Sequence, residues 1–222
     1  MNAIVTRADS NIKEMTDITH PILKEYAAKC NADFKIISES KGLHPHYRIM
    51  QCKELLDEYD RIIVLDSDML ILNSCPDLFE LVPDDSIGVV YEDKGSRQED
   101  RLSRIKKIQD LRGNIGWDSD YINTGCFVVS KIHQSIFVTK NLYNDLGYDD
   151  VELGYQIHKR RFNIFELPYT FNFMSMWTES WCGAKKSDAF ILHYAGNGFT
   201  LLEDRVTQIK NDYNILKRYN LI

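Results

Sequence analysis

Two aspartates stand in the most apolar stretch of the chain. Residues 61–72 read RIIVLDSDMLIL, so that Asp66 and Asp68 separate two apolar runs. In an extended segment, side chains at positions i and i+2 point to the same side, and both carboxylates can then face one site. Carboxylates this close repel each other unless a cation lies between them, and their oxygens suit Mg²⁺ or Mn²⁺. We therefore predict a divalent metal at Asp66 and Asp68, which binds substrate phosphates and acts as a Lewis acid on a leaving group.

The same tripeptide returns at residues 118–120, in different surroundings. With 21 aspartates in 222 residues, about two Asp-x-Asp triplets are expected by chance, and aspartate after a strand is also a common turn or N-cap residue. The first copy follows an apolar strand, whereas the second follows the glycine-containing segment GNIGW. We predict a metal site at the first copy and a loop at the second.

The segments around Asp66 alternate between strand and helix patterns. Strands are predicted at 2–6, 34–38 and 61–65, and helices at 11–30, which Pro21 breaks or kinks, and at 47–58. The third strand is apolar on both faces, as a central strand covered by helices should be. This order predicts an α/β fold with a largely parallel sheet, and open sheets of this kind bind ligands at the carboxyl edge, where Asp66 lies.

The second half of the chain is more mixed. Strands are predicted at 86–92 and 121–130, short strands at 163–168 and 189–194, and helices near 133–146, 151–161 and 201–218. The charged segment 94–112 is either a solvated helix or a loop. Because there is no repeat and no linker-like stretch, we predict a single domain.

The overall composition argues against several classes of protein. A net charge of −6 leaves no basic surplus to neutralise nucleic-acid phosphates. No apolar run is long enough for a transmembrane helix, and the start of the chain lacks a signal pattern. The five cysteines are odd in number and have no CxxC spacing, which argues against a disulfide framework or structural zinc. We expect a soluble cytoplasmic protein, with peripheral membrane contact left open.

Residues 47–72, YRIMQCKELLDEYDRIIVLDSDMLIL, resemble the central signature of glycosyltransferase family 8, which includes glycogenin and bacterial lipopolysaccharide galactosyl- and glucosyltransferases. In that family a Tyr-Arg pair opens a helix, and a strand then delivers the metal-binding Asp-x-Asp. The resemblance implies a single-domain GT-A fold, a Rossmann-like nucleotide-diphospho-sugar transferase fold with a mixed central sheet flanked by helices. It also implies a nucleotide-binding half over 1–70 and a donor-sugar and acceptor half over 71–222.

Two further segments resemble the family in the same order. IVTRAD at 4–9 resembles the first strand and turn, which implies uridine contacts at Thr6, Ala8 and Asp9. YINTGCFVVS at 121–130 resembles the Asn-x-Gly strand, which implies that Asn123 touches the donor sugar beside Gly125.

The last two matches depart in part from the family. DDVELGYQ at 149–156 stands where the family carries Asp-Gln, which implies an acceptor-side carboxylate at Glu152, although these acids could also merely begin a helix. LHYAGNGF at 192–199 resembles a His-x-x-Gly-x-x-Lys element, which implies His193 as the third metal ligand and Gly196 and Gly198 beside the diphosphate. Phe199 stands near the place of the lysine, so the charge of the diphosphate must be met by the metal or by Arg48, Lys185 or Lys186.

Taken together, the resemblance implies metal-dependent transfer of a sugar from a nucleotide sugar, with a UDP-sugar preferred, to a hydroxyl of a glycan, glycoprotein or glycolipid. Asp66, directly or through water, Asp68 and His193 would hold Mn²⁺ or Mg²⁺, with Ser67 beside the donor. Asn123, Asp120 and Glu152 would orient the donor sugar and the acceptor. Family 8 enzymes retain the anomeric configuration, whereas Glu152 acting as a base would invert it.

Two other interpretations remain. A sugar nucleotidyltransferase also uses carboxylates and Mg²⁺, but it usually has a glycine-rich phosphate loop after the first strand, and TRADSNIKEM contains no glycine. A non-catalytic carbohydrate-binding domain on the same fold is disfavoured by the intact Asp-x-Asp together with His193.

Overall fold

The computed structural model describes all 222 residues and contains a six-stranded mixed sheet beside a two-stranded one. The large sheet has the order β2-β1-β3-β6-β5-β7, with the strands β1 (Asn2–Arg7), β2 (Asp33–Ile37), β3 (Arg61–Leu65), β5 (Ser86–Tyr91), β6 (Ile122–Ser130) and β7 (Asn163–Glu166). Strands β2, β1 and β3 are parallel, β6 is antiparallel to both of its neighbours, and β7 is parallel to β5. The small sheet pairs β4 (Met69–Ile71) with β8 (Ile191–His193) in antiparallel fashion. The predicted α/β fold with a mixed central sheet is confirmed.

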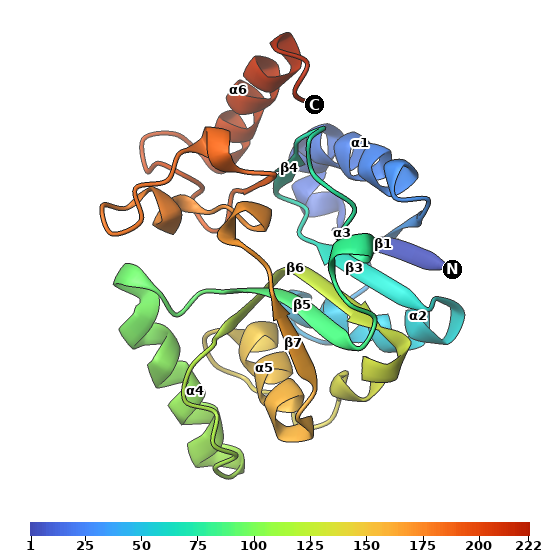
Figure 1. Cartoon of the computed structure of the whole chain (residues 1–222), viewed down its shortest axis with the longest axis vertical. Helices are drawn as coiled ribbons and strands as arrows, with labels where there is room; N and C mark the ends of the chain where they lie inside the picture. Colours follow the sequence, from blue (N-terminus) through green and yellow to red (C-terminus); the bar gives the residue numbers. More distant parts are fainter.

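Helices lie on both sides of the large sheet (Figure 1). They are α1 (Lys13–Lys29), α2 (Cys52–Glu58), α3 (Leu78–Leu81), α4 (Gln98–Arg112), α5 (Tyr148–Arg160) and α6 (Arg205–Arg218), with seven short 3₁₀ helices between them. In Figure 1 the helices α1 and α6 lie above the sheet with the β4–β8 pair, and α4 and α5 lie below it. None of the helices is both long and apolar enough to cross a membrane.

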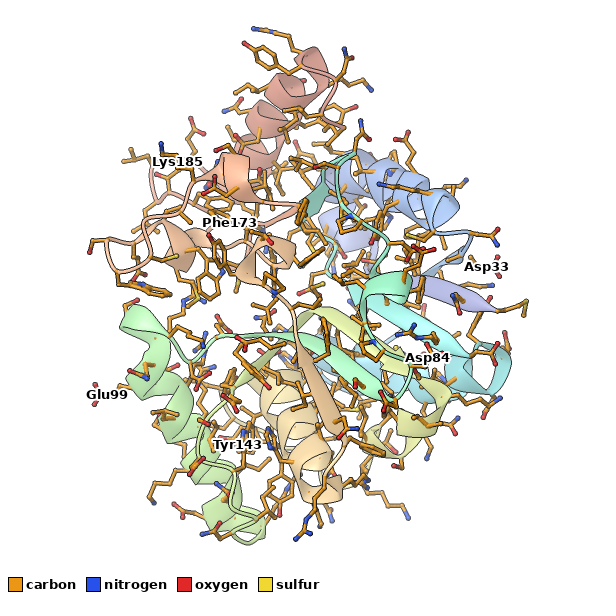
Figure 2. All side chains as sticks on the ribbon, viewed as in Figure 1. Asp33, Asp84, Glu99, Tyr143, Phe173 and Lys185 are labelled. Atoms are coloured by element: carbon orange, nitrogen blue, oxygen red, sulfur yellow. The ribbon has the colours of Figure 1, made fainter.

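Alternate residues of the central strands feed two separate cores. On β3, Ile63 and Leu65 join the core under α1, whereas Ile62 and Val64 join the core against α2 and α5. A smaller third cluster lies between α4 and α5. Figure 2 shows Phe173 of the first core and Tyr143 of the third on opposite sides of the sheet. The apolar strand 61–65 is therefore buried on both faces, as the sequence predicts.

Three of the predicted helices differ in the structure. Helix α1 runs through Pro21 without a break. Pro21 lies on the exposed face, and Asp17, whose carbonyl loses its hydrogen-bond partner, is an exposed residue. The segment 47–58 divides into a 3₁₀ helix (Pro45–Gln51) and α2. The helix predicted near 133–146 is wrong: a 3₁₀ helix ends at Ile136, and the left-handed backbone at Asn141 and Gly147 is incompatible with a continuous α-helix.

Candidate metal centre

The turn Asp66-Ser67-Asp68 joins β3 to β4, and hydrogen bonds to β6 and to α1 fix its backbone. The N–H of Asp66 donates to the carbonyl of Gly125 on β6 (2.9 Å), and the hydroxyl of Thr19 donates to the carbonyl of Ser67 (2.6 Å). Because β4 pairs with β8 in a register that places Met69 opposite His193, the imidazole lies beside Asp68. The topology thus brings together residues that are more than 120 positions apart in the sequence.

Three donor atoms converge at this turn. His193 Nε2 lies 3.3 Å from Asp68 Oδ1 and 3.7 Å from Asp66 Oδ2. The other oxygen of each carboxylate accepts from an arginine: Asp66 Oδ1 from Arg7, and Asp68 Oδ2 from Arg205 at 2.9 Å. One oxygen of each aspartate and one imidazole nitrogen are therefore left facing one another, with all candidate ligand atoms within 4.8 Å. Two carboxylates and an imidazole form a donor set that fits Mn²⁺ or Mg²⁺.

The charges at the centre are coupled. Burial alone would raise the pKa of Asp68, but His193 and Arg205 outweigh it and lower that pKa to about 2. Burial likewise opposes a charge on His193, yet the Asp68 and Asp66 carboxylates raise its pKa above the usual value. Without a metal, the imidazole therefore tends to hold a proton between the carboxylates, at the place where a cation fits.

Gly125 leaves the space that the candidate ligands Asp66 and His193 occupy. A Cβ atom at this position would lie 2.6 Å from His193 Cε1, 2.8 Å from Asn123 Oδ1 and 3.0 Å from Asp66 Oδ2. All three distances are at or below the limit of real carbon contacts, so only glycine lets β6 pass this close to the centre.

A cavity of about 380 Å³ opens next to the three donors. It is lined by Arg7, Ile12, Met15, His44, Pro45, His46, Arg48, Asp66, Ser67, Asp68 and Arg205. At its side Arg48 forms an ion pair with Asp9. Thr6 and Ala8 are buried and do not line the cavity, and the Thr6 hydroxyl lies 3.3 Å from that of Ser67. Gly196 and Gly198 lie in the loop before α6 with positive φ angles of 62° and 74°.

The structure does not bring Glu152 to this cavity. Its side chain is fully buried, with Oε1 accepting from Arg112 (2.7 Å) and Gln156 (2.9 Å) and Oε2 accepting from the N–H of Tyr143 (2.8 Å). Asp120 also does not line the cavity. Its backbone is left-handed (φ 65°), and its N–H donates to Asp93 (2.9 Å). Glu152 therefore fixes the segment around Tyr143 against α5 and is closed to an acceptor.

The carboxylates that do approach the centre from α5 are Asp149 and Asp150. Asp149 is buried and pairs with Arg7, which bridges it to Asp66. Asp150 accepts from both the N–H and the hydroxyl of Thr124 (2.8 Å each). Burial, and then the neighbouring Asp149 carboxylate, raise the pKa of Asp150 to about 8.

Sequence reasoning missed Arg7, Arg205 and Asn172 as residues of the site. Arg7 lies in the segment TRAD between Thr6 and Ala8, two of the predicted uridine contacts, and a cation beside a predicted nucleotide site is a signal that the sequence contains. Arg205 reaches Asp68 across 137 positions, and Asn172 accepts from His193 across 21, so no local pattern points to either.

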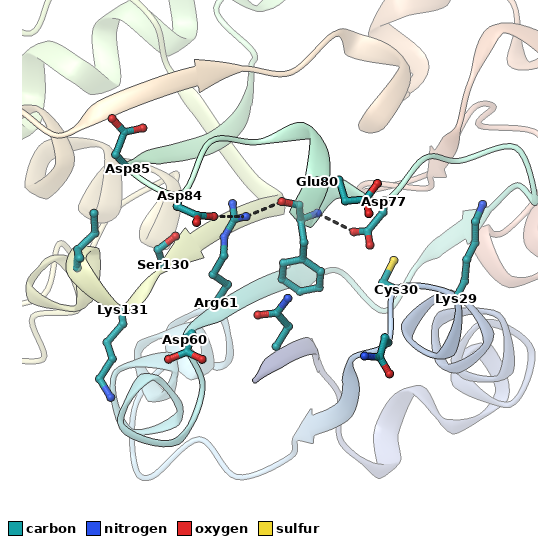
Figure 3. Close-up of a pocket in the computed structure, with 14 residues that line it drawn as sticks. Lys29, Cys30, Asp60, Arg61, Asp77, Glu80, Asp84, Asp85, Ser130 and Lys131 are labelled. Atoms are coloured by element: carbon teal, nitrogen blue, oxygen red, sulfur yellow. Dashed lines mark hydrogen bonds and ion pairs between the residues drawn. The ribbon is translucent and has the colours of Figure 1, made fainter.

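A second and larger cavity, of about 830 Å³, lies near the start of β3 and the end of β6, at the opposite end of these strands from the metal centre (Figure 3). Its charged groups mostly bind each other or the backbone: Arg61 pairs with Asp84 (2.7 Å), and Asp77 accepts from the N–H of Phe79 (2.7 Å). It contains no cluster of possible metal ligands.

Comparison with solved structures shows a common fold. A glycosyltransferase involved in the glycosylation of the major capsid of PBCV-1 matches with a TM-score of 0.60 and 17% identity, over 95% of this chain and 98% of that one. The galactosyltransferase LgtC, in complex with donor and acceptor sugar analogs, matches with a TM-score of 0.60 and 13% identity, over 96% and 95%. A Drosophila β-1,4-galactosyltransferase 7 mutant, in complex with manganese, UDP-Gal and xylobiose, matches with a TM-score of 0.50 and 15% identity, over 74% and 63%.

No family model and no curated protein matches the sequence. The structural likenesses establish the GT-A glycosyltransferase fold. Membership of glycosyltransferase family 8 stays a prediction.

Proposed function

We propose that this protein is a metal-dependent glycosyltransferase that moves a sugar from a nucleotide sugar, a UDP-sugar above others, to a hydroxyl of a glycan acceptor. The observation that carries the proposal is the convergence of one free oxygen from Asp66, one from Asp68 and Nε2 of His193 beside an open cavity, on a fold shared with glycosyltransferases. A divalent cation bound there would supply Lewis acidity at the diphosphate as the sugar–phosphate bond breaks.

The balance of charge supports a cation and a diphosphate together. Linked ion pairs at the cavity join three arginines to four aspartates, namely Arg7, Arg48, Arg205, Asp9, Asp66, Asp68 and Asp149. This cluster has one negative charge in excess, which a proton on His193 offsets in the absence of a metal, so it presents no net positive charge to a diphosphate. A divalent cation in the place of that proton makes the cluster positive, so the donor should bind well only together with the metal.

Arg205 is the residue best placed to meet the leaving diphosphate. Its guanidinium lines the cavity, is one-third exposed and comes from the first turn of α6. Lys185 and Lys186 do not line the cavity, and Lys186 pairs with Asp212 instead. Arg205 and Arg48 would hold the phosphate oxygens in fixed positions, which stabilises the charge that develops on the leaving group.

The stereochemical part of the proposal is retention. An inverting reaction needs a base on the acceptor side, and Glu152 is buried, paired with Arg112 and closed to an acceptor. The acidic groups that approach the centre from α5, Asp149 and Asp150, are engaged with Arg7 and Thr124. We therefore assign them to orientation of the donor sugar and not to proton abstraction.

The test is a screen of UDP-glucose, UDP-galactose, GDP- and dTDP-sugars by thermal shift, with Mn²⁺ or with EDTA, followed by nucleotide release with and without sugar acceptors. We expect stabilisation by one UDP-sugar only when metal is present, and slow hydrolysis without acceptor. Asp68→Asn should lower both Mn²⁺ affinity and turnover by about 100-fold or more, since it removes a ligand and not only a ligand's partner.

Asp118→Asn is the matched control, because Asp118 belongs to the second copy of the tripeptide and is exposed. It should leave both quantities unchanged. Full turnover in EDTA, or full turnover of Asp68→Asn, would show that the proposed function is wrong. Binding of a sugar without any hydrolysis or transfer would instead identify a binding domain.

A further inference from the structure

A chain of buried side chains runs from His193 to a carboxylate at the end of β5. His193 Nδ1 lies 2.7 Å from Asn172 Oδ1, Asn172 Nδ2 donates to Asn123 Oδ1 (2.8 Å), and Asn123 Nδ2 donates to Glu92 Oε2 (3.1 Å). The four residues are exposed by only 3, 0, 8 and 1% in that order. Because water cannot replace these partners, each bond constrains the next.

The orientation of each amide group in this series of hydrogen bonds is fixed from the Glu92 end. A carboxylate can only accept, so Glu92 requires the amide nitrogen of Asn123 to face it. The N–H of Gly125, which can only donate, points at Asn123 Oδ1 (2.9 Å) and requires the same orientation. Asn172 must then turn its nitrogen toward Asn123 and its oxygen toward His193. In its neutral, metal-binding form the imidazole consequently carries its single proton on Nδ1, which leaves the Nε2 lone pair directed at the cation site beside Asp66 and Asp68.

We infer that Glu92, Asn123 and Asn172 are positioning residues that select the Nδ1–H form of His193 and so keep Nε2 open for a divalent cation. This inference rests on the proposed metal site. It gives Asn123 a different role from the donor-sugar contact that the sequence implies, because both ends of its amide are already engaged inside the protein. It also connects the metal centre to the start of α4, since Arg97 at the N-cap of this helix and Arg101 within it both bind Glu92 Oε1.

Glu92→Gln tests the inference without touching any ligand of the metal. The two arginines both use Oε1, so the single oxygen of glutamine should stay with them, and its amide nitrogen should face the amide nitrogen of Asn123. Two donors then oppose each other, and the selection of the Nδ1–H form is lost. Loss of such an outer partner of a metal-binding histidine typically lowers metal affinity by about 10- to 100-fold.

Two measurements follow, both without any sugar nucleotide. Mn²⁺ affinity is measured by electron paramagnetic resonance titration, and the protonated nitrogen of His193 is identified by ¹⁵N NMR with Mg²⁺, with His193→Gln used for assignment. We expect Nδ1–H in the wild-type protein and a 10- to 100-fold weaker Kd for Mn²⁺ in Glu92→Gln. Asn172→Leu, which removes the partner of Nδ1 directly, should weaken Mn²⁺ binding as well and serves as the second variant if Glu92→Gln does not fold.

Glu152→Gln is the matched control, because Glu152 is an equally buried carboxylate paired with an arginine but has no connection to His193. It should keep the wild-type Kd for Mn²⁺. Wild-type affinity in folded Glu92→Gln or Asn172→Leu, or a neutral Nε2–H tautomer in the Mg²⁺-loaded wild-type protein, would overturn the inference. A wild-type protein that binds no Mn²⁺ would instead overturn the proposed function, so the two failures are distinguishable.

Discussion

Gly125→Ala is the substitution whose effect on the centre follows most directly from the geometry. The new Cβ would lie 2.6 Å from His193 Cε1, whereas ordinary contact begins at 3.4 Å. The backbone is held at this point, because the carbonyl of Gly125 accepts from the N–H of Asp66 and the N–H of Gly125 donates to Asn123 Oδ1. The imidazole must therefore retreat by about 0.8 Å, several times the roughly 0.2 Å within which metal–ligand distances are held.

Two quantities should change in Gly125→Ala. Overpacking a filled core costs about 1–3 kcal/mol, which for a chain of this size lowers Tm by roughly 2–4 °C per kcal/mol. Displacement of one of the three candidate ligands should also weaken Mn²⁺ binding by at least about tenfold. This is the smallest effect typical of losing only an outer hydrogen-bond partner of a metal ligand. Calorimetry gives the first quantity and Mn²⁺ titration the second.

Gly88→Ala separates packing from metal binding. Gly88 lies on β5, and a Cβ there would meet Val82 at 2.7 Å and Val128 at 3.1 Å, far from any candidate ligand. Both variants should therefore lose stability, but only Gly125→Ala should lose Mn²⁺ affinity. If Gly125→Ala binds Mn²⁺ as the wild-type protein does, His193 is not a ligand held in this position and the reasoning about the centre is refuted.

Three further substitutions have distinct expected outcomes. Because the pKa of Asp150 is raised to about 8, the native protein keeps a proton on this carboxyl that the unfolded chain loses above about pH 4. The free energy of unfolding should therefore fall as pH rises from about 4 to 8. Asp150→Asn should flatten this dependence, which is measured as Tm against pH. Arg205→Ala should raise KM for the donor by roughly 10- to 100-fold even at saturating Mn²⁺, because a hydrogen bond to a charged group contributes about 1.5–3 kcal/mol. An equal KM would remove Arg205 from the phosphate site. Glu152→Gln should lower Tm, since it breaks a buried ion pair with Arg112, while kcat measured well below Tm stays the same; a large fall in kcat would restore Glu152 as a catalytic residue.

Local pattern was enough to predict the strands and to single out the candidate metal ligands. The run Ile62–Leu65 is apolar on both faces, and this is a direct consequence of burial between two layers of helices. Asp66 and Asp68 follow it at the carboxyl edge, and His193 follows a second apolar run in the same way. In each case the signal is a polar residue at the end of a buried strand, and a few consecutive residues are enough to show it.

The acidic segment at α5 shows where local pattern fails. Helix α5 begins at Tyr148, so Asp149 and Asp150 occupy its first turn. Glu152 lies two positions after Asp150, about 200° around the helix axis, and must therefore point in a different direction. Without the phase of the helix, three neighbouring acids could not be told apart. Arg205 and Asn172 reach the centre only through the pairing of distant segments, for which a single sequence contains no signal.

The two copies of Asp-Ser-Asp differ by what the fold places opposite them. Asp66 and Asp68 lie between two strands, and the second of these pairs with the strand that ends at His193. Asp118 is exposed in a bend before β6, and Asp120 adopts a left-handed backbone whose N–H is bound by Asp93. The carboxylates of this second pair act electrostatically on the imidazole of His158, but they form no cluster of possible metal ligands with it. The tripeptide by itself therefore specifies no chemistry. A third donor, a fixed tautomer and two arginines that occupy the outer oxygens are what turn the first copy into a candidate metal centre.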